Sequence, residues 1–431
     1  MDAVERAQQL CNDVHLEVAA HDSTEQLLTS LRACFSSSSP CSHASALRER
    51  AFSALHSAAP APTSLPSQLL RKVYLCASCL EASLLLREGV PAQGAAALRL
   101  LDLAHMLCEP HALLRELTAS ALLLHAAQGA AAPQLPVLSP EAVAAAALAA
   151  RRALTGLPIP LLALPTAAEF SAAALRPALP CCITGALAHW PALAPPAAGS
   201  PDRRWADLAY LWRAAGPRTV PVEEGCNAAT GGYLAPGFAL RLCTLGDFLC
   251  DTVAPSALAF LAGQPQPPPR SGVPYLAQHA LFDACPQLAQ DIATPDYIFC
   301  NAGAAGPLPH VTTQAWLGPQ GTYTPFHTDP THNMLAQVVG IKRVRLLAPQ
   351  ATPCMHAAPP PLQNTSTAPR GAFTCPATAA AAASTHPLLQ QCPVKAMEAV
   401  LGPGDMLFIP RGWWHECEAL SPSFSVSFWW D

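Results

Sequence analysis

The sequence predicts an α+β protein in which a helical N-terminal domain precedes a β-rich domain. Apolar residues recur at three- and four-residue steps up to about residue 126, and short apolar or alternating runs split by Pro and Gly follow further on. The 431 residues also exceed one compact core, at a prior of roughly 150 residues per domain. We therefore expect a helical domain over residues 1–130, a linker over 131–164 and a second domain over 165–431.

The composition excludes several classes of protein. With 51% hydrophobic residues, 12% charged residues and 46 prolines without a period, the chain is neither disordered nor collagen-like. It holds no run of about 20 apolar residues free of Pro or charge, so we expect no membrane association. A net charge of −5 gives no basic field, which disfavours direct nucleic acid binding and tolerates a cationic peptide better.

The N-terminal residues and the cysteines predict an intracellular protein, nuclear and/or cytoplasmic. The first residues mix acids with polar residues and lack the basic-then-apolar pattern of a signal peptide. The 17 cysteines are odd in number and scattered through apolar segments, which is typical of reduced, partly buried thiols. Cys76 and Cys79 form a C-x-x-C without a second pair, so core packing is favoured over a redox or zinc site.

Helical periodicity in the first domain indicates an antiparallel bundle. Apolar residues run from Leu75 to Leu86 and from Ala95 to Leu107, with Gly89 and Pro91 between them. Further helices are expected at Gln8–Ala19, Ser23–Cys34 and His111–Ala127. No catalytic constellation occurs here, which favours a docking or stabilising role. The mixed Gly, Ala and Pro of Gln128–Pro140 then predict a linker.

The second domain reads as a β-sandwich or barrel with added helices. Strands are expected at Cys181–Thr184, Thr219–Val222, Tyr297–Cys300, Ala336–Val339, Val344–Leu347, Met406–Ile409 and Phe424–Trp430. Helices are expected at Leu208–Ala215 and Thr244–Asp251. Gln264–Arg270 and the Ala-, Pro- and Thr-rich run 351–395 read as loops inserted into the sheet. The second is long enough to form a lid.

Two histidines and a carboxylate suggest a metal site. His327 and Asp329 are two residues apart, so on a strand they would share one face, and a distant strand would supply His415. Such a 2-His-1-carboxylate set leaves three positions open, as a non-heme Fe(II) oxygenase requires, whereas zinc usually prefers closed tetrahedral ligation. An H-x-D pair also arises by chance, and Asp-Pro is a turn signal, so a structural role stays open.

Lys342 strengthens the metal hypothesis. Alternation in 342–346 places Lys342 on one face with Val344 and Leu346, and the two arginines on the other. A lysine on an apolar face needs an anion, for which the carboxylate of 2-oxoglutarate is suited. An internal Asp or Glu, or a strand-end lysine that reaches solvent, remains the alternative.

The C-terminal strand alternates over 423–430. Phe424, Val426, Phe428 and Trp430 share one face, and the serines between them share the other. For the serine face we expect a solvated or packed sheet surface rather than a binding surface. Gly404-Asp405 predicts a turn into Met406–Ile409, which would lead on to His415.

In combination, these motifs resemble the JmjC-domain 2-oxoglutarate oxygenases over about 165–431, and the helical half fits that architecture more loosely. The resemblance is carried by Tyr275-Leu-Ala-Gln-His, Trp316-Leu-Gly-Pro-Gln-Gly-Thr, His327-Thr-Asp-Pro-Thr-His-Asn333, Gln337-Val-Val-Gly-Ile-Lys342, Leu407-Phe-Ile-Pro410 and Ser423-Phe-Ser-Val-Ser-Phe-Trp-Trp430. It implies a double-stranded β-helix, or cupin, that holds Fe(II) through His327, Asp329 and His415.

The resemblance also implies the cofactor site. Lys342 would pair with the distal carboxylate of 2-oxoglutarate, helped by Tyr275, Thr324 and Asn333, with dioxygen as co-substrate. Thr324 stands where the closest relatives use serine, which keeps the hydroxyl and adds a methyl group. Arg411-Gly-Trp departs from the family pattern and leaves the pocket rim near His415 open.

For the substrate, the resemblance implies a protein or peptide that is basic. Glu223, Gln278 and Trp316 match positions of the family's substrate pocket, and a carboxylate with an aromatic wall suits an arginine guanidinium. A surface acid and a core tryptophan would explain the same residues structurally. The implied activity is therefore arginine hydroxylation, with histone N-methyl-lysine demethylation as the runner-up. The rivals are a non-catalytic JmjC binding module and a small-molecule cupin without 2-oxoglutarate.

Overall fold

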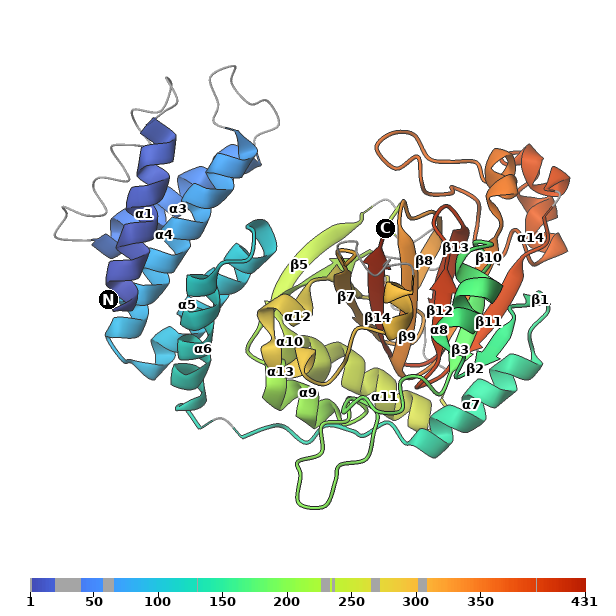
Figure 1. Cartoon of the computed structure of the whole chain (residues 1–431), viewed down its shortest axis with the longest axis horizontal. Coiled ribbons are helices and arrows are strands. Elements are labelled where there is room, and N and C mark those ends of the chain that lie inside the picture. Colours follow the sequence, from blue (N-terminus) through green and yellow to red (C-terminus); the bar gives the residue numbers. More distant parts are fainter. Residues whose placement is uncertain are drawn as a thin grey trace. The chain divides into compact units, whose positions relative to one another are not determined.

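The computed structural model divides the chain into two compact units, one of residues 1–132 with 217–219, the other of 133–216 with 220–431 (Figure 1). The structure describes residues 2–19, 40–56, 66–129, 131–225, 233–234, 237–264, 272–300, 308–392 and 394–431. The expected helix 23–34 and nearly all of the expected loop 264–270 lie outside these ranges. Within them, no helix is both long and apolar enough to cross a bilayer.

The first unit is helical, as predicted. Its described helices are α1 (Ala3–Ala19), α3 (Pro40–Leu55), α4 (Ser67–Arg87), α5 (Pro91–Leu107) and α6 (Ala112–Ala126). Four of these confirm expected helices. The exception is α3, which buries only Ala44, Leu47 and Ala51. So few buried residues, two of them alanines, leave a weak periodic signal in the sequence.

Helix α4 forms the centre of this unit. It packs against α1, α3 and α5, and every residue from Val73 to Leu84 is buried. A helix covered on all sides is largely apolar, and the charged residue of this stretch, Glu81, pairs with Arg48 (2.9 Å). Cys76 and Cys79 lie within this stretch and are fully buried. The C-x-x-C therefore occupies the core of the bundle.

The second unit contains two main sheets, which confirms the α+β class. The larger has the order β2 (Leu161–Ala163), β3 (Cys181–Thr184), β12 (Met406–Ile409), β9 (His332–Val339), β14 (Ser423–Trp430), β7 (Thr312–Gly318), β6 (Leu276–His279). The smaller has the order β1 (Leu157–Pro158), β11 (Met397–Leu401), β10 (Lys342–Leu347), β13 (Trp414–Ala419), β8 (Tyr323–His327). A separate pair joins β4 (Thr219–Glu224) and β5 (Ala239–Thr244). Leu335 and Leu407 of the larger sheet share one apolar cluster with Val344 and Leu346 of the smaller, so the sheets face each other.

Helices cover the other face of the larger sheet. The apolar face of β14, including Phe424 and Phe428, packs there against Trp205, Phe248 and their neighbours. The α-helices on this side are α8 (Ala167–Phe170), α9 (Leu208–Ala215), α10 (Leu245–Phe248), α11 (Ala254–Leu261), α12 (Leu281–Ala284) and α13 (Pro286–Ala289). Two π-helical turns continue α8 and α10, η1 (Ser171–Leu175) and η2 (Leu249–Val253). Within this unit, Figure 1 shows α9, α10, α12 and α13 on the side away from α14.

One expected strand is wrong. Residues 297–300 fall in and beside a 3-10 helix, η3 (Asp296–Phe299), which begins after Pro295. Tyr297 and Ile298 are buried in the core against the helices. A run of four apolar residues can be buried by a single turn as well as by a strand, and alternation cannot distinguish the two at this length.

The expected linker 131–164 is largely structured. It contains helix α7 (Pro140–Arg152) and the strands β1 and β2, which pair in parallel with β11 and β3. Ser139 caps α7 by accepting from the amide of Ala142 (3.2 Å), and Pro140 occupies its first turn. Alanine-rich composition suggested a linker, yet the same composition has high helix propensity.

The insert 351–395 is also ordered rather than a bare loop. It connects β10 to β11 and involves the short helices η4 (Pro349–Cys354), α14 (Pro376–Ala381) and η5 (Pro387–Gln391). Its residues 364–366 lie along β8: the amide of Ser366 donates to Phe326 O (2.7 Å), and the amide of Thr328 donates to Asn364 O (2.9 Å). This segment therefore covers the open edge of the smaller sheet.

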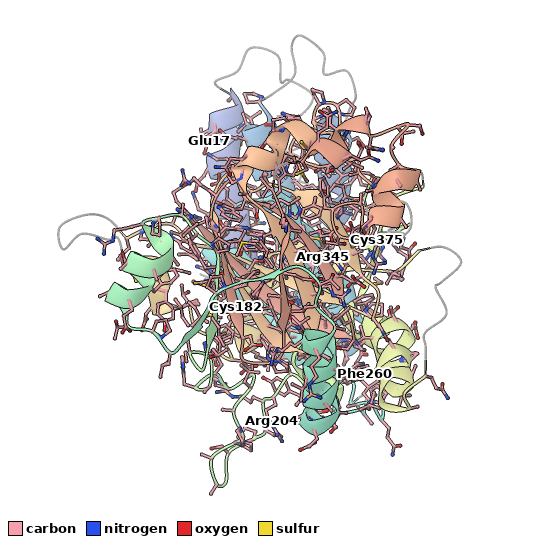
Figure 2. All side chains as sticks on the ribbon, turned by 90° about the vertical axis from the view of Figure 1, so that its right-hand side faces the viewer. Glu17, Cys182, Arg204, Phe260, Arg345 and Cys375 are labelled. Atoms are coloured by element: carbon pink, nitrogen blue, oxygen red, sulfur yellow. The ribbon has the colours of Figure 1, made fainter. Side chains whose placement is uncertain are left out.

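Buried charges connect three strands of the smaller sheet. Arg345 on β10 donates to Glu398 on β11 (2.8 Å) and to Glu416 on β13 (2.7 Å), and Tyr323 Oη donates to Glu416 (2.6 Å). Figure 2 shows Arg345 among the strands of the sheet. Burial alone would raise the pKa of Glu398, but amide hydrogen bonds and the charge of Arg345 outweigh it and lower that pKa. The Glu398 carboxylate is thus held ionised by its partners.

We predict that Arg345→Met destabilises the second unit by about 3 kcal/mol or more, because two buried carboxylates lose their counter-charge. Urea unfolding followed by tryptophan fluorescence measures this unit alone, since all eight tryptophans lie in it. Arg213→Met is the matched control, because Arg213 pairs with Asp207 at the surface and should cost less than about 1 kcal/mol. Equal losses in both variants would contradict the prediction.

Candidate metal centre

His327, Asp329 and His415 converge on one point. His327 ends β8 and lies directly opposite His415 of β13 in the antiparallel pairing. Their ring centroids are 4.1 Å apart, and Asp329 lies 3.9 Å from His327 Nε2 and 3.7 Å from His415 Nε2. The three ligand atoms all fall within 4.8 Å of one another, as no other group of this kind does among the described residues.

The expectation that His327 and Asp329 share a strand holds only in part. Strand β8 ends at His327, and Asp329 lies beyond it in the following turn. Asp329 is held there by Gly412, whose amide donates to its carbonyl (3.0 Å). Gly412 has a φ of 75°, a conformation that glycine adopts without steric cost. The pairing of β13 with β8 also shifts register between His415 and Cys417.

Both imidazoles are oriented for metal binding. His327 Nδ1 lies 2.9 Å from Pro325 O, and His415 Nδ1 lies 3.1 Å from Trp413 O. With Nδ1 protonated and donating to these carbonyls, each Nε2 presents a lone pair to the shared point. Burial and the charge of His327 lower the pKa of His415 to about 4, so His415 is neutral at pH 7. The donor set thus fits a divalent ion with open positions.

Trp429 fixes the carboxylate. Its indole Nε1 donates to Asp329 Oδ2 (2.9 Å) from β14 in the opposite sheet. The sequence analysis did not identify Trp429, although it continues the serine face of β14 at the two-residue spacing of strands. That face is buried rather than solvated: Ser427 is 1% exposed and accepts from the indole of Trp316 (3.1 Å).

A narrow pocket is lined by His327 and His415 and contains Lys342. The residues predicted for the cofactor, Tyr275, Thr324, Asn333 and Lys342, all line it together with Trp316, Cys417 and Trp429. Lys342 is 3% exposed and donates from Nζ to Tyr275 Oη (3.3 Å). No carboxylate of the described residues forms an ion pair with Lys342, so neither an internal acid nor solvent satisfies its charge.

The polar groups of this pocket fit a small dicarboxylate. Burial lowers the pKa of Lys342 to about 8, against the opposing charge of Cys417, which shows the cost of an ammonium group without an anion. Asn333 also lines the pocket, and its side-chain NH2 group can donate to an anion. One cation, the hydroxyls of Tyr275 and Thr324 and this amide therefore surround the same space. These residues fit Fe(II) with 2-oxoglutarate.

The structure separates the three predicted substrate residues. Trp316 lines the pocket, 5.9 Å from the ring of Tyr275. Glu223 lies on β4 and exchanges backbone hydrogen bonds with Tyr275 (2.8 and 3.0 Å). Gln278 is exposed, with a positive φ of 46°, and lines neither the pocket nor the groove beside Asp329.

Tyr233 and Thr365 join this neighbourhood, and the sequence analysis did not identify them. The two hydroxyls lie 2.8 Å apart. The backbone of Thr365 forms an antiparallel β-bridge with His327 at the end of β8. Burial raises the pKa of Tyr233 to about 12, and the charges of Glu223 and Asp329 add to the effect. The charges of Glu223 and Asp329 therefore both act on the Tyr233 hydroxyl.

A wider groove of about 610 Å³ opens beside Asp329. The turn after β8 forms one wall, with Thr328 and Pro330, and the insert forms another, with Gln363 and Asn364. Arg411, which departs from the family pattern, lies at its rim and pairs with Asp431 (3.2 Å). Asp329 lines this groove, whereas His327 and His415 line the narrow pocket. The two cavities therefore border the candidate metal centre on different residues.

We predict that Trp429→Phe weakens Mn(II) binding to the apo protein by about tenfold, because Asp329 loses the donor that orients it. Titration of free Mn(II) by electron paramagnetic resonance measures the change. Trp430→Phe is the matched control, since the adjacent Trp430 packs in the core on the other face of β14. Indistinguishable dissociation constants for the two variants would rule out this role for Trp429.

Comparisons with known proteins agree with this geometry. Residues 167–431 match the family of cupin-like domains. Jumonji C domain-containing protein 5 of Drosophila melanogaster is 34% identical over 84% of this chain and 80% of its own length. Lysine-specific demethylase 8 of Xenopus tropicalis is 35% identical over 63% of this chain, and Lysine-specific demethylase JMJ30 of Arabidopsis thaliana is 36% identical over 59%.

These matches differ in their extent. The aligned region covers 52% of the Xenopus protein and 50% of the Arabidopsis protein, about half of each, whereas it covers most of the Drosophila protein. The match to the cupin-like domain begins after β2 and runs through β14, so it includes every strand of both sheets except β1 and β2, and all three converging residues. The chain belongs to the family of cupin-like proteins with a JmjC domain.

Proposed function

We propose that this protein is an Fe(II)- and 2-oxoglutarate-dependent oxygenase that hydroxylates arginine side chains of basic protein or peptide substrates. The observation that carries the proposal is the convergence of His327, Asp329 and His415 beside a pocket whose buried Lys342 lacks an anion. When bound, iron and 2-oxoglutarate supply the oxidising chemistry, in which dioxygen hydroxylates a C–H bond and succinate and carbon dioxide are released. The protein's residues determine where that chemistry is applied.

In this proposal, the pocket residues bind and orient the cofactor. His327, Asp329 and His415 would occupy three metal positions and leave three open. The ammonium of Lys342, with the hydroxyls of Tyr275 and Thr324, would hold the distal carboxylate. Trp316, Trp429 and Ile409 line the same pocket and limit the access of water. A dry pocket strengthens each of these polar contacts.

The choice of arginine is supported by the surroundings of Glu223. Its charge acts on the Tyr233 hydroxyl together with that of Asp329, so the negative charge of Glu223 reaches the same hydroxyl as that of a proposed metal ligand. Trp316 and Trp429, with centroids 6.2 Å apart, supply aromatic surface in the pocket. A guanidinium is stabilised by both kinds of group, a carboxylate fork and an aromatic face.

Demethylation of N-methyl-lysine, as in histones, is the second candidate. The Xenopus and Arabidopsis relatives are named lysine-specific demethylases. The same centre would serve, because hydroxylation of an N-methyl carbon gives a hemiaminal that releases formaldehyde.

A non-catalytic binding module is the rival of a different class. Residence in the nucleus or cytoplasm belongs to the proposal, since a basic protein substrate is found there.

We predict that 2-oxoglutarate binds more weakly as the pH rises past about 8. Lys342 must be charged to hold a carboxylate, and in the free pocket its pKa is about 8. Binding should therefore be roughly tenfold weaker at pH 9 than at pH 7. The metal-to-ligand charge-transfer band of the anaerobic Fe(II) complex measures the affinity.

Two variants test the role of Lys342 in this pH dependence. Lys342→Arg keeps its charge at both pH values, so its affinity should not change between them, and Lys342→Ala should bind weakly throughout. A wild-type protein that develops no band at any pH would sink the oxygenase proposal. A band with unchanged affinity across this range would contradict only the assignment of Lys342.

We predict that aerobic turnover with arginine-containing basic peptides adds one oxygen to the arginine side chain, as detected by mass spectrometry. Glu223→Gln should lower kcat/KM by about tenfold, since it removes the charged partner of the guanidinium. Glu224→Gln is the matched control, because the neighbouring Glu224 pairs with Arg241 at the surface. Loss of a methyl group from N-methyl-lysine peptides with formaldehyde release, and no change in arginine peptides, would instead establish the second candidate.

A further inference from the structure

The two ends of the insert lie side by side. The amide of Leu388, in η5, donates to His356 Nε2 just after η4 (3.3 Å). The rings of His356 and His386 also meet, with centroids 4.9 Å apart. Residues 354–356 and 386–392 therefore run together where the chain enters and leaves the insert.

A pair of cysteines lies at this junction. Cys354 ends η4 and is buried, and Cys392 follows η5 and is partly exposed. Cys392 packs against the apolar cluster that contains Ala351, Met355 and Trp414, and Met355 is the residue directly after Cys354. Burial and the nearby Cys392 sulfur raise the pKa of Cys354. Neither thiol lines the metal centre or its pocket.

We propose that Cys354 and Cys392 form a redox-sensitive disulfide that closes the insert into a ring. The closed loop spans about 40 residues, a length at which cross-linking removes much of the conformational entropy of the unfolded chain. The pairing does not depend on the oxygenase activity proposed above. It uses two groups that have no role in that chemistry.

The cross-link forms with a peroxide as oxidant. The Cys392 thiolate, on the more exposed residue, attacks one peroxide oxygen and breaks the O–O bond, which leaves a sulfenic acid and releases water after protonation. The Cys354 thiolate then attacks the Cys392 sulfur, breaks the S–O bond and releases a second water. Two thiols are oxidised to one disulfide, and one hydrogen peroxide is reduced to two water molecules.

The position of the ring links it to the metal centre. Residues 364–366, which pair with β8 beside His327, and the groove residues Gln363 and Asn364 lie between the two cysteines in the chain. Thr352 Oγ1, two residues before Cys354, accepts from the indole of Trp414 (2.9 Å), the neighbour of His415. Closing the ring therefore restrains one wall of the groove.

The test uses the full chain, reduced and then exposed to increasing hydrogen peroxide. Free thiols are blocked with N-ethylmaleimide, and the protein is digested with trypsin without reductant. Because Arg370 lies between the two cysteines, trypsin separates their peptides unless a disulfide joins them. We expect the 354–392 cross-link to appear in mass spectra at a lower peroxide concentration than any other pair and to disappear with reductant.

Cys375 provides the matched control. It is exposed on the same insert, at the start of α14, and is labelled in Figure 2. Cys375→Ser should leave the cross-link intact, whereas Cys392→Ser should abolish it. If Cys392 is oxidised singly to sulfinic acid, or pairs with Cys375, the proposal is overturned. Wild type and Cys375→Ser suffice for this decision if the Cys392 variant does not fold.

Discussion

The pairing of β13 with its two neighbours is the constraint on which the site depends. On one side of β13, His415 lies opposite His327 of β8. On its other side, His415 lies opposite Leu346 of β10, and Ala419 lies opposite Lys342 of the same strand. Side chains alternate between faces along a strand, so a slip of one residue would turn the ligands and Lys342 away from the interior. The two histidines of the candidate metal centre and Lys342 thus share one register.

Buried charge on the outer face specifies that register. Arg345 lies opposite both Glu398 and Glu416 in the paired strands and donates to each. In a shifted pairing these carboxylates would be buried without a counter-charge, at a cost of several kcal/mol. The interior of the smaller sheet holds the candidate metal centre and Lys342, and its outer face holds the ion pairs that select its geometry. The insert adds to this outer set through Arg370, which pairs with Glu418.

The sequence predicted the features that follow from regular alternation and missed those that follow from turns or from opposing strands. Lys342 could be placed on the interior face because its strand alternates, and the two-unit division followed from the change in periodicity. Asp329 could not be placed on a turn, because spacing alone does not show where a strand ends. Trp429 was missed because its partner, Asp329, is remote in the chain, and alanine-rich α7 was mistaken for a linker because composition does not show which alanines are buried. Gln278 lines neither cavity, and its positive φ is a local backbone feature that spacing does not show.

The position of β14 has a consequence for how the second unit folds. This strand follows all the others in the chain, yet it lies between β7 and β9 in the larger sheet. Until it is synthesised and inserted, β7 with β6 and β9 with β12 form two separate groups with open edges, which are prone to wrong pairing. The larger sheet cannot be completed strand by strand during translation. Its assembly is a late, long-range event, typical of slow-folding β topologies.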